Sequence, residues 1–345
     1  MDSLTKKLLV AGGVGMAAFW AGREILRRSR WFEWEGKSVI VTGGSRGFGL
    51  VLARQLLDAG ARVAICARTE EDLRVAEQEL LKRGEVIAIP CDVRSREQVQ
   101  DMVAQVIERF DAVDVLFNVA GIIEVGPIDS MTLDDYEDAM QTHFWGPLYA
   151  TQAVLPEMRR RGWGRIVNVS SIGGKRAVPH LVPYSASKFA LVGLSHGLRA
   201  ELARENILVT AICPTLMRTG SPRNAAFKSQ HEKEFAWFTL GASTPWVSMS
   251  AEKAARQTML ACQRGESEMI LSNYTNPLIH LQQLTPGLAR ELAALANRLL
   301  PEMGGIGAQA APGYASRSAW TPHWLTRLTD RAAARNNEVR PNRSE

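Results

Sequence analysis

A strand, a glycine-rich turn and a helix in direct succession constrain the fold of this chain most strongly. Residues 37–42 (K-S-V-I-V-T) form a short run with β-branched apolar side chains, and residues 43–49 (G-G-S-R-G-F-G) follow at once. Residues 50–57 have the apolar spacing of a helix. Glycine in such a turn lets the backbone approach a pyrophosphate at the helix N-terminus, where the amides favour anions. An ordinary glycine-rich turn is the alternative, and the flanking strand and helix argue against it.

Further apolar runs lie at residues 62–66, 86–91 and 113–117, with helical stretches between them. Strands that alternate with helices predict an α/β fold, a Rossmann-type doubly wound parallel sheet with helices on both faces. Ligands of such sheets bind at the carboxyl ends of the strands. Asp92, Asn118, Ser171 and Pro214 fall at such ends, so we expect them near a ligand.

Tyr184 and Lys188 lie four residues apart, and Ser171 lies thirteen residues before Tyr184. Positions i and i+4 share one face of a helix, so the phenol and the ammonium can reach the same space. A nearby cation favours the phenolate and lowers the pKa of a tyrosine. Tuned in this way, Tyr184 could exchange a proton with a carbonyl or alcohol oxygen that Ser171 also holds. The tyrosine–lysine spacing alone is common in helices, and its weight comes from the motifs around it.

Together these residues resemble the short-chain dehydrogenase/reductase family over roughly residues 37–271. Thr42 to Gly49 match its T-G-x-x-x-G-x-G turn, and residues 118–121 match its N-N-A-G segment. The resemblance implies hydride transfer between a nicotinamide and a substrate carbon, with Ser171, Tyr184 and Lys188 as the catalytic residues. Tyr184 would donate the proton during reduction, Ser171 would hold the oxygen, and Lys188 would lower the pKa of Tyr184. It also implies these cofactor-binding residues: Gly43, Ser45, Arg46, Gly47, Phe48, Gly49, Arg68, Asp92, Val93, Asn118, Ala120, Gly121, Tyr184, Lys188, Pro214 and Thr219.

Three positions depart from the pattern of that family. Val119 replaces the second asparagine of N-N-A-G, and Thr215 replaces the glycine after Pro214. His143 stands where the family commonly has an asparagine that holds a proton-relay water. A histidine there could bind a water, carry a proton or simply pack in a helix.

Two arginines favour NADP(H) over NAD(H) as the cofactor. An acidic residue at the end of the second strand would bind the ribose 2′-hydroxyl of NAD, but residues 66–68 (Cys-Ala-Arg) contain none. Arg46 in the glycine-rich turn and Arg68 could together pair with a 2′-phosphate. For Arg68, a solvated charge at a strand end is the alternative interpretation.

Composition narrows the class of protein further. The net charge of +5 is spread along the chain, so we predict no nucleic-acid binding. Four cysteines, three of them at predicted strand ends, indicate buried thiols rather than a disulfide framework. No metal site is predicted, because the chain has no C-x-x-C motif and no histidine cluster. Reduced thiols and a nucleotide cofactor together indicate the inside of a cell.

Residues 8–22 carry no charge, and Lys6 and Lys7 precede them. More basic residues follow, namely Arg23, Arg27, Arg28 and Arg30. A membrane anchor is the favoured interpretation, with a cytoplasmic catalytic domain because the basic residues lie mainly after the run. A helix packed on protein and a signal peptide are the alternatives. Aromatic residues fit an interfacial belt in the first case, namely Trp20, Trp31, Phe32 and Trp34.

The chain divides into residues 1–35, a hydrophobic helix and linker; residues 36–275, the catalytic domain; and residues 276–345, a helical extension. The extension contains predicted helices at 288–300 and 320–334, a linker or strap at 304–318, and a tail past Asn336 that we expect to be disordered. The segment after Pro214 is rich in aromatic residues, which either line an apolar substrate pocket or pack a lid: Phe227, Phe235, Trp237, Phe238 and Trp246.

The functional hypothesis is an NADP(H)-dependent oxidoreductase for a small carbonyl or alcohol substrate of apolar character, such as a lipid, steroid, terpenoid or long-chain ketone or aldehyde. The alternative is a catalytically inactive NADP(H)-binding regulatory or scaffold protein. By resemblance only, helices at residues 135–160 and from Tyr184 onward form the contact of a homo-oligomer.

Overall fold

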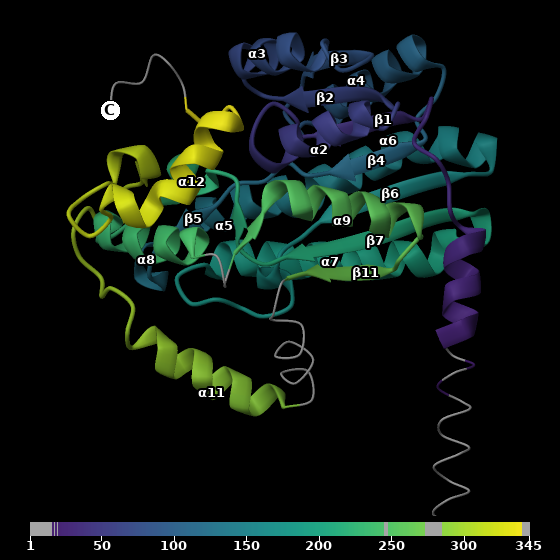
Figure 1. Ribbon diagram of the computed structural model, residues 1–345. Coiled ribbons are helices and arrows are strands. Elements are labelled where there is room, and N and C mark those ends of the chain that lie inside the picture. Colours follow the sequence, from purple (N-terminus) through teal and green to yellow (C-terminus); the bar gives the residue numbers. More distant parts are fainter. Residues whose placement is uncertain (1–15, 17, 19, 245–247, 273–284, 340–345) are drawn as a thin grey trace, which may run out of the picture.

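A seven-stranded parallel sheet forms the centre of the protein (Figure 1). The computed structural model describes residues 16, 18, 20–244, 248–272 and 285–339. The strand order is β11-β7-β6-β4-β1-β2-β3. The strands are β1 (Ser38–Thr42), β2 (Arg62–Ala67), β3 (Val86–Pro90), β4 (Val115–Asn118), β6 (Gly164–Val169), β7 (Ile207–Pro214) and β11 (Glu268–Leu271). The chain leaves β1 toward β2 and later returns to its other side with β4, so a crevice forms at the carboxyl ends of β1 and β4.

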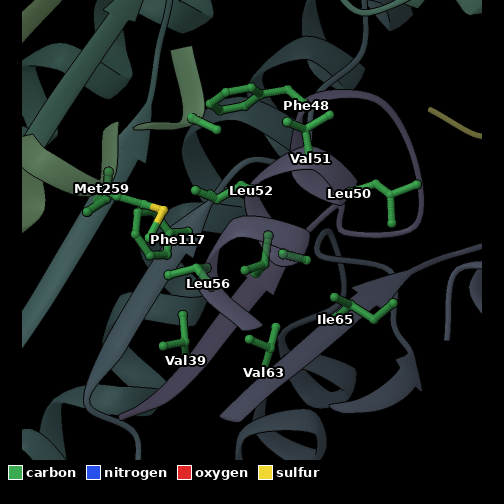
Figure 2. Packing of buried hydrophobic residues seen from close by; sticks show 14 of the residues in the cluster. Val39, Phe48, Leu50, Val51, Leu52, Leu56, Val63, Ile65, Phe117 and Met259 are labelled. Atoms are coloured by element: carbon green, nitrogen blue, oxygen red, sulfur yellow. The ribbon is translucent and has the colours of Figure 1, made fainter. Parts of the chain in front are cut away.

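Helices cover both faces of the sheet, which confirms the doubly wound prediction. They are α2 (Gly47–Asp58), α3 (Glu70–Leu80), α4 (Arg96–Phe110), α5 (Leu133–Met140), α6 (Gly146–Arg161), α7 (Val182–Leu202) and α9 (Ala251–Gln263). Val39 and Val41 of β1 pack against α2, α3 and α9 on one face (Figure 2). Ile40 faces the opposite core with α4 and α6. This alternation along β1 is what a strand buried on both faces requires.

Smaller elements extend the edge of the cleft. β5 (Glu124–Val125), β9 (Ala226–Phe227) and β12 (Ala311–Pro312) form a three-stranded sheet, and β8 (Met217–Arg218) pairs with β10 (Met249–Ser250). The helix α8 (His231–Ser243) lies beside this sheet. Phe227, Phe235 and Phe238 are buried against one another, with ring centroids 5.3 and 5.9 Å from that of Phe227. These aromatic side chains therefore pack the lid, while Trp246 lies outside the described residues.

The C-terminal extension contains both predicted helices, α11 (Pro286–Asn297) and α12 (His323–Arg335). Figure 1 shows α12 beside α8 at one end of the sheet. The prediction of disorder past Asn336 was wrong for the next residues. Asn336 and Glu338 are buried, because the chain folds back from α12 onto the glycine-rich turn.

Only the end of the uncharged N-terminal run belongs to the described residues. Residues 20–29 are helical, and both Arg23 and Arg27 pair with Glu266 in the turn before β11. Phe32 and Trp34 pack in the core instead of forming an interfacial belt. Within the part of the chain that the structure describes, no helix has the length and apolar character needed to cross a membrane.

Candidate active site

A cleft of about 460 Å³ lies at the carboxyl ends of the central strands. Most of the predicted site residues line it: Gly43, Ser45, Arg46, Gly47, Phe48, Gly49, Arg68, Asp92, Val93, Ala120, Gly121, Tyr184, Lys188 and Thr219. The fold therefore brings together residues from the glycine-rich turn, four strand ends and α7.

The glycine-rich turn needs its glycines for conformation and for space. Gly43 and Gly47 have positive φ angles of 69° and 56°, which L side chains rarely adopt. A Cβ atom on Gly49 would lie 2.2 Å from the carbonyl oxygen of Gly43, and one on Gly43 would lie 2.8 Å from the Cα of Ala120. The turn is thus packed against the β4 loop and begins α2 at Gly47. The side chain of Arg46, the residue before α2, makes no capping hydrogen bond to the helix. The first turn of α2 also contains no acidic residue.

Arg46 and Arg68 both line the cleft, as the sequence predicts. Arg68 is exposed, whereas Arg46 lies between two carboxylates. Its Nη1 atom is 3.9 Å from Asp72 Oδ2, and its Nε atom is 3.9 Å from Glu338 Oε2. No carboxylate lies at the end of β2 itself, but Asp72 and Glu338 bring two carboxylates to Arg46 from other parts of the chain.

Asp92 lies at the end of β3 and lines the same cleft, with Val93 beside it. Its carboxylate accepts hydrogen bonds from Arg94 Nε and Nη2, at 3.0 and 2.8 Å to Oδ2. Burial alone would raise the pKa of Asp92, but the hydrogen bonds and charge of Arg94 outweigh it and lower the pKa. Asp92 is therefore an ionised acceptor at the edge of the cleft.

Three of the predicted site residues are not among those that line the cleft, namely Asn118, Ser171 and Pro214. The Nδ2 atom of Asn118 donates to Asn168 Oδ1 at 2.8 Å, so its amide joins β4 to β6 below the cleft. The neighbouring loop lacks the second asparagine of the family pattern. Thr42 Oγ1 accepts hydrogen bonds from the backbone N–H groups of Val119 and Ala120 at 3.0 and 3.2 Å, so the loop is held by the backbone and a hydroxyl.

The three predicted catalytic residues lie close together, and two of them, Tyr184 and Lys188, line the base of the cleft. Ser171 follows β6, and its Oγ accepts a hydrogen bond from Gly173 N–H at 3.0 Å. A Cβ atom built on Gly173 would lie 3.1 Å from the Tyr184 ring and 3.5 Å from Ser171 Oγ, so both side chains flank this glycine. Lys188 Nζ donates to the carbonyl of Val169 at 3.0 Å and lies 5.7 Å from the ring centroid of Tyr184.

The pKa of Tyr184 differs from the expectation. Burial raises it above its ordinary value, and the hydrogen bond with Ser171 only partly opposes this effect. Burial also lowers the pKa of Lys188 to about 7. The predicted lowering of the tyrosine pKa by the lysine is therefore wrong for this state of the protein, because both groups are desolvated together. A neutral phenol is the form that can give up a proton.

His143 is a buried, neutral part of the site's framework. Its Nε2 accepts a hydrogen bond from Ile122 N–H at 3.1 Å, and its Nδ1 lies 2.8 Å from Ser187 Oγ. Burial and the charge of Lys188 hold the pKa of His143 well below its usual value. The ring also meets Tyr184 edge to face, at 5.4 Å between centroids. Of the three roles that the sequence left open, packing matches this geometry, because both nitrogens already have partners. The bond to Ile122 N–H adds a role that the sequence did not suggest, since it positions the loop after β4.

The sequence did not predict the part that the C-terminal segment takes in the site. Glu338 lines the cleft, Asn337 Nδ2 donates to Ser45 O at 3.0 Å, and Gly47 N–H donates to Asn336 O at 2.8 Å. Two consecutive asparagines after α12 indicate the end of a helix. No local pattern indicates where the chain goes next.

The residues present fit a dinucleotide. The close approach of the turn to the β4 loop requires glycine, as the built Cβ contacts show. The cleft also carries an arginine at the turn and, at its base, the half-buried Tyr184 and the buried Lys188. Fold and site together define a dinucleotide-binding α/β oxidoreductase.

Comparison with known proteins agrees with this class. A sequence profile of the short chain dehydrogenases matches residues 37–229. A protein from Streptomyces coelicolor, provisionally named a ketoacyl reductase, is 43% identical over 188 residues, which are 54% of this chain and 72% of that one. The chain therefore belongs to the short-chain dehydrogenase family and is an oxidoreductase that acts on CH–OH groups with NAD(P).

Solved structures show the same fold. A short-chain dehydrogenase from Streptomyces avermitilis superposes with a TM-score of 0.64 at 30% identity and covers 76% of this chain and 98% of its own. A gluconate 5-dehydrogenase from Burkholderia cenocepacia, in complex with NADP and tartrate, has a TM-score of 0.61 at 27% identity and covers 69% and 94%.

Proposed function

We propose that this protein is an NADP(H)-dependent carbonyl reductase or alcohol dehydrogenase that acts on a small apolar substrate. The set of Ser171, Tyr184 and Lys188 carries this proposal. The half-buried Tyr184 and the buried Lys188 line the same cleft as the glycine-rich turn, and the half-buried Ser171 flanks Tyr184 at Gly173. The raised pKa of Tyr184 supports a protonated phenol at neutral pH, which is the form needed to protonate a developing alkoxide.

Each residue has a separate role in this proposal. Tyr184 moves a proton to or from the substrate oxygen, and Ser171 donates a hydrogen bond to the same oxygen, where negative charge develops. Lys188, whose pKa is lowered to about 7, can hold the ribose hydroxyls of the nicotinamide half and replenish the tyrosine proton. When bound, the nicotinamide supplies or accepts the hydride. His143 and Thr42 position the loop that bears Ala120 and Gly121.

The preference for NADP(H) rests on Arg46 and Arg68 in the cleft. The separations of 3.9 Å between Arg46 and its two carboxylates exceed ordinary hydrogen-bond lengths. The guanidinium can therefore turn toward a 2′-phosphate at modest cost. The NADP complex of the related gluconate 5-dehydrogenase supports the same choice.

An apolar substrate is supported by the side of the cleft beyond Gly121. Ile122, Ile123, Ala225 and Ala226 line it. The large aromatic side chains of the lid are not among the residues that line the cleft, so the apolar part of this side is aliphatic, with Glu124 and Asn224 as polar neighbours.

The assay follows NADPH absorbance with a panel of ketones and aldehydes that includes steroids, terpenoids and long-chain carbonyls. Wild type is compared with Tyr184→Phe. We expect turnover of apolar members of the panel by wild type and its loss in the variant. Equal slow rates in both proteins would contradict the enzymatic proposal. Tight NADPH binding without any turnover would instead identify a regulatory or scaffold protein.

We further infer that residues 8–22 attach the catalytic domain to a membrane from the cytoplasmic side. The uncharged run and the exposed side chains of Met16 and Trp20 support this inference. Deleting residues 1–15 should move the protein from the membrane fraction to the supernatant, whereas unchanged sedimentation of the two forms would refute it. Arg23 and Arg27 stay in the deleted form, since they bind Glu266.

We also infer a homo-oligomer that pairs through α5, α6 and α7. Large apolar side chains are exposed on α5 and α7, namely Leu133, Val182 and Phe189, and Trp145 is exposed directly before α6. Light scattering of wild type and Phe189→Glu tests this inference. A monomer mass for the wild type would contradict it.

A further inference from the structure

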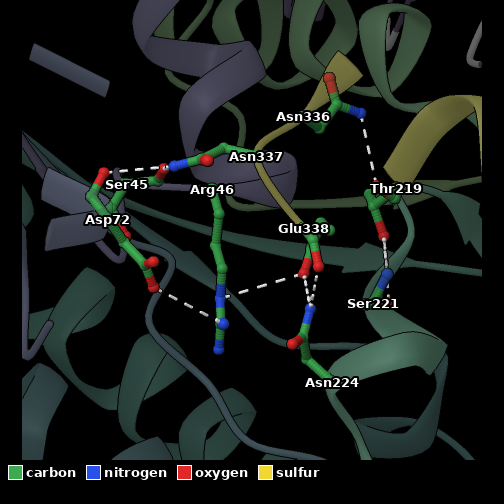
Figure 3. Close-up of polar contacts among 9 residues, drawn as sticks. All are labelled: Ser45, Arg46, Asp72, Thr219, Ser221, Asn224, Asn336, Asn337 and Glu338. Carbon is green, nitrogen blue, oxygen red and sulfur yellow. Dashed lines mark hydrogen bonds and ion pairs between the residues drawn. The ribbon is translucent and has the colours of Figure 1, made fainter. Parts of the chain in front are cut away.

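The phosphate end of the cleft already contains an anionic group from the protein's own chain. After α12 the chain turns at Asn337, whose φ angle is 55°, and places the side chain of Glu338 against the glycine-rich turn (Figure 3). A Cβ atom built on Gly47 would lie only 2.5 Å from Glu338 Oε1. Glu338 is 5% exposed, and its carboxylate therefore fills space at the start of α2.

This segment uses the groups of the turn that suit a phosphate. Asn336 O accepts the N–H of Gly47 at 2.8 Å, which is the first amide of α2. Glu338 pairs with Arg46, the arginine proposed to bind the 2′-phosphate. Amides at a helix N-terminus and arginine are the usual partners of phosphate groups. The α2 sequence supplies no acid of its own there, so the C-terminal segment provides the negative charge.

Other contacts hold the segment in place without blocking its release. Asn337 Nδ2 donates to the carbonyls of Ser45 and Asp72 at 3.0 and 3.2 Å, and Asn224 Nδ2 donates to Glu338 O at 3.1 Å. The helix before it is anchored independently, because a Cβ on Gly220 would overlap Ala333 at 2.4 Å from its Cα. Thus the segment can leave while α12 stays docked.

We propose that residues Asn336–Glu338 form a C-terminal latch that occupies the phosphate-binding part of the dinucleotide site and competes with the cofactor. The proposal rests on the dinucleotide binding inferred above. The side chain of Glu338 and a pyrophosphate cannot share the turn, because Glu338 already fills the space beside Gly47 and its ionised form would also repel a phosphate. Cofactor affinity is then reduced by the fraction of molecules in which the latch is open.

The latch is tested directly by measuring the affinity for NADPH of the full chain and of four variants. A chain ending at Arg335 removes the latch, and one ending at Val339 removes only the residues beyond it. Glu338→Gln keeps the shape of the side chain without its charge, and Val339→Ala is the matched control in the same segment. Binding is measured by titration calorimetry, and thermal unfolding verifies that each variant is folded.

We expect the chain ending at Arg335 to bind NADPH about tenfold or more tightly, as expected for a latch closed in at least ~90% of molecules. Glu338→Gln resembles the uncharged side chain that burial favours in the closed latch, so the latch should close more firmly and NADPH should bind more weakly than to wild type at neutral pH. The two controls should equal wild type. Unchanged or weaker binding in the shortened chain would overturn the latch, since the segment would then be a wall of the site. Failure of every form to bind NADPH or NADH would overturn the dinucleotide site itself.

Hydrogen exchange of the wild-type protein gives a second readout that needs no variant. The N–H groups of Asn336 and Glu338 donate to the backbone of α12 at 3.0 Å each. Saturating NADPH should speed exchange in the peptide that contains residues 336–339. Slower exchange there would mean that the segment closes over the cofactor, which contradicts competition.

Discussion

The two ends of the cleft are constructed from very different spans of the chain. At the catalytic end, Ser171, Tyr184 and Lys188 come from one short stretch that ends β6 and begins α7. At the phosphate end, the turn around Arg46 is completed by Asn337, which lies 292 residues from its partner Ser45. The first arrangement is fixed by the packing of the sheet. The second depends on a segment near the C-terminus that can leave without disturbing the core.

This contrast suggests that the chemical step and the binding of the cofactor depend on different parts of the chain. A change at the catalytic end should alter turnover, because the proposed mechanism places its side chains at the substrate oxygen. A change at the phosphate end should alter cofactor binding and leave the chemical step intact. The following predictions test that separation, beginning with the largest effect.

Lys188→Met should lower kcat/KM by about 10³-fold, because the proton of Tyr184 could no longer be replenished. The same variant should be more stable than wild type by about 1–3 kcal/mol at neutral pH, since a buried ammonium is replaced by an apolar side chain. Thermal unfolding and NADPH oxidation measure the two effects. Lys253→Met, at an exposed position of α9, is the control and should change neither.

The gain in stability of Lys188→Met should depend on pH. The pKa of Lys188 is lowered to about 7 in the folded protein, and an unfolded lysine titrates near about 10.4. The cost of the charged lysine is complete below the folded pKa and disappears as the pH rises to the unfolded value. The stability difference should therefore shrink above neutral pH, and a constant difference would show that Lys188 is not held in a poorly hydrated site.

Arg46→Ala should weaken NADPH binding about 10- to 100-fold more than NADH binding, because a charge-assisted pair with the 2′-phosphate is lost. The ratio of the two affinities is the informative quantity, since releasing Glu338 affects both cofactors. Arg74→Ala removes an exposed arginine of α3 that pairs with Glu71, and it should leave the ratio unchanged. Equal losses for NADPH and NADH in Arg46→Ala would refute recognition of the 2′-phosphate.

His143→Phe tests whether the catalytic end has a fourth proton carrier. The substitution keeps an aromatic ring beside Tyr184 and leaves Ile122 N–H without its acceptor. We expect the free energy of unfolding to fall by about 1–3 kcal/mol, and kcat to fall less than about tenfold. A loss of about 10²-fold in kcat with unchanged stability would mean that the ring takes part in proton transfer.

The sequence predicted those features that depend on neighbouring residues. Strand, turn and helix around Gly43 to Gly49 follow from local patterns, and so does the pairing of Tyr184 with Lys188 on α7. The position of Asn118 was predicted correctly at the end of β4, but its amide faces Asn168, 50 residues away. A sequence pattern predicts where a residue lies on a strand, but it does not predict the hydrogen-bond partner of its side chain.

Features that depend on burial or on contacts between distant residues could not be predicted from the sequence. The raised pKa of Tyr184 comes from desolvation, which only the packed structure supplies. The latch was expected to be disordered, because its residues are polar and lack periodicity. Its order comes from the turn it meets, and Arg46 had already been assigned to a cofactor.

The smallest expected effect is a pH dependence of the latch. Burial raises the pKa of Glu338 to about 7, while Arg46 lowers and the nearby Asp72 raises it. A released glutamate titrates near about 4.3, so opening the latch releases a proton between these two values. Higher pH therefore favours the open latch, and NADPH binding should tighten as the pH rises from about 5 to 7, by less than tenfold per pH unit.

The 2′-phosphate and other groups also titrate in this range, so the difference between wild type and Glu338→Gln isolates the contribution of Glu338. Calorimetry at several pH values should give a steeper rise for wild type, and parallel curves for the two proteins would mean that Glu338 keeps its proton state when the cofactor binds.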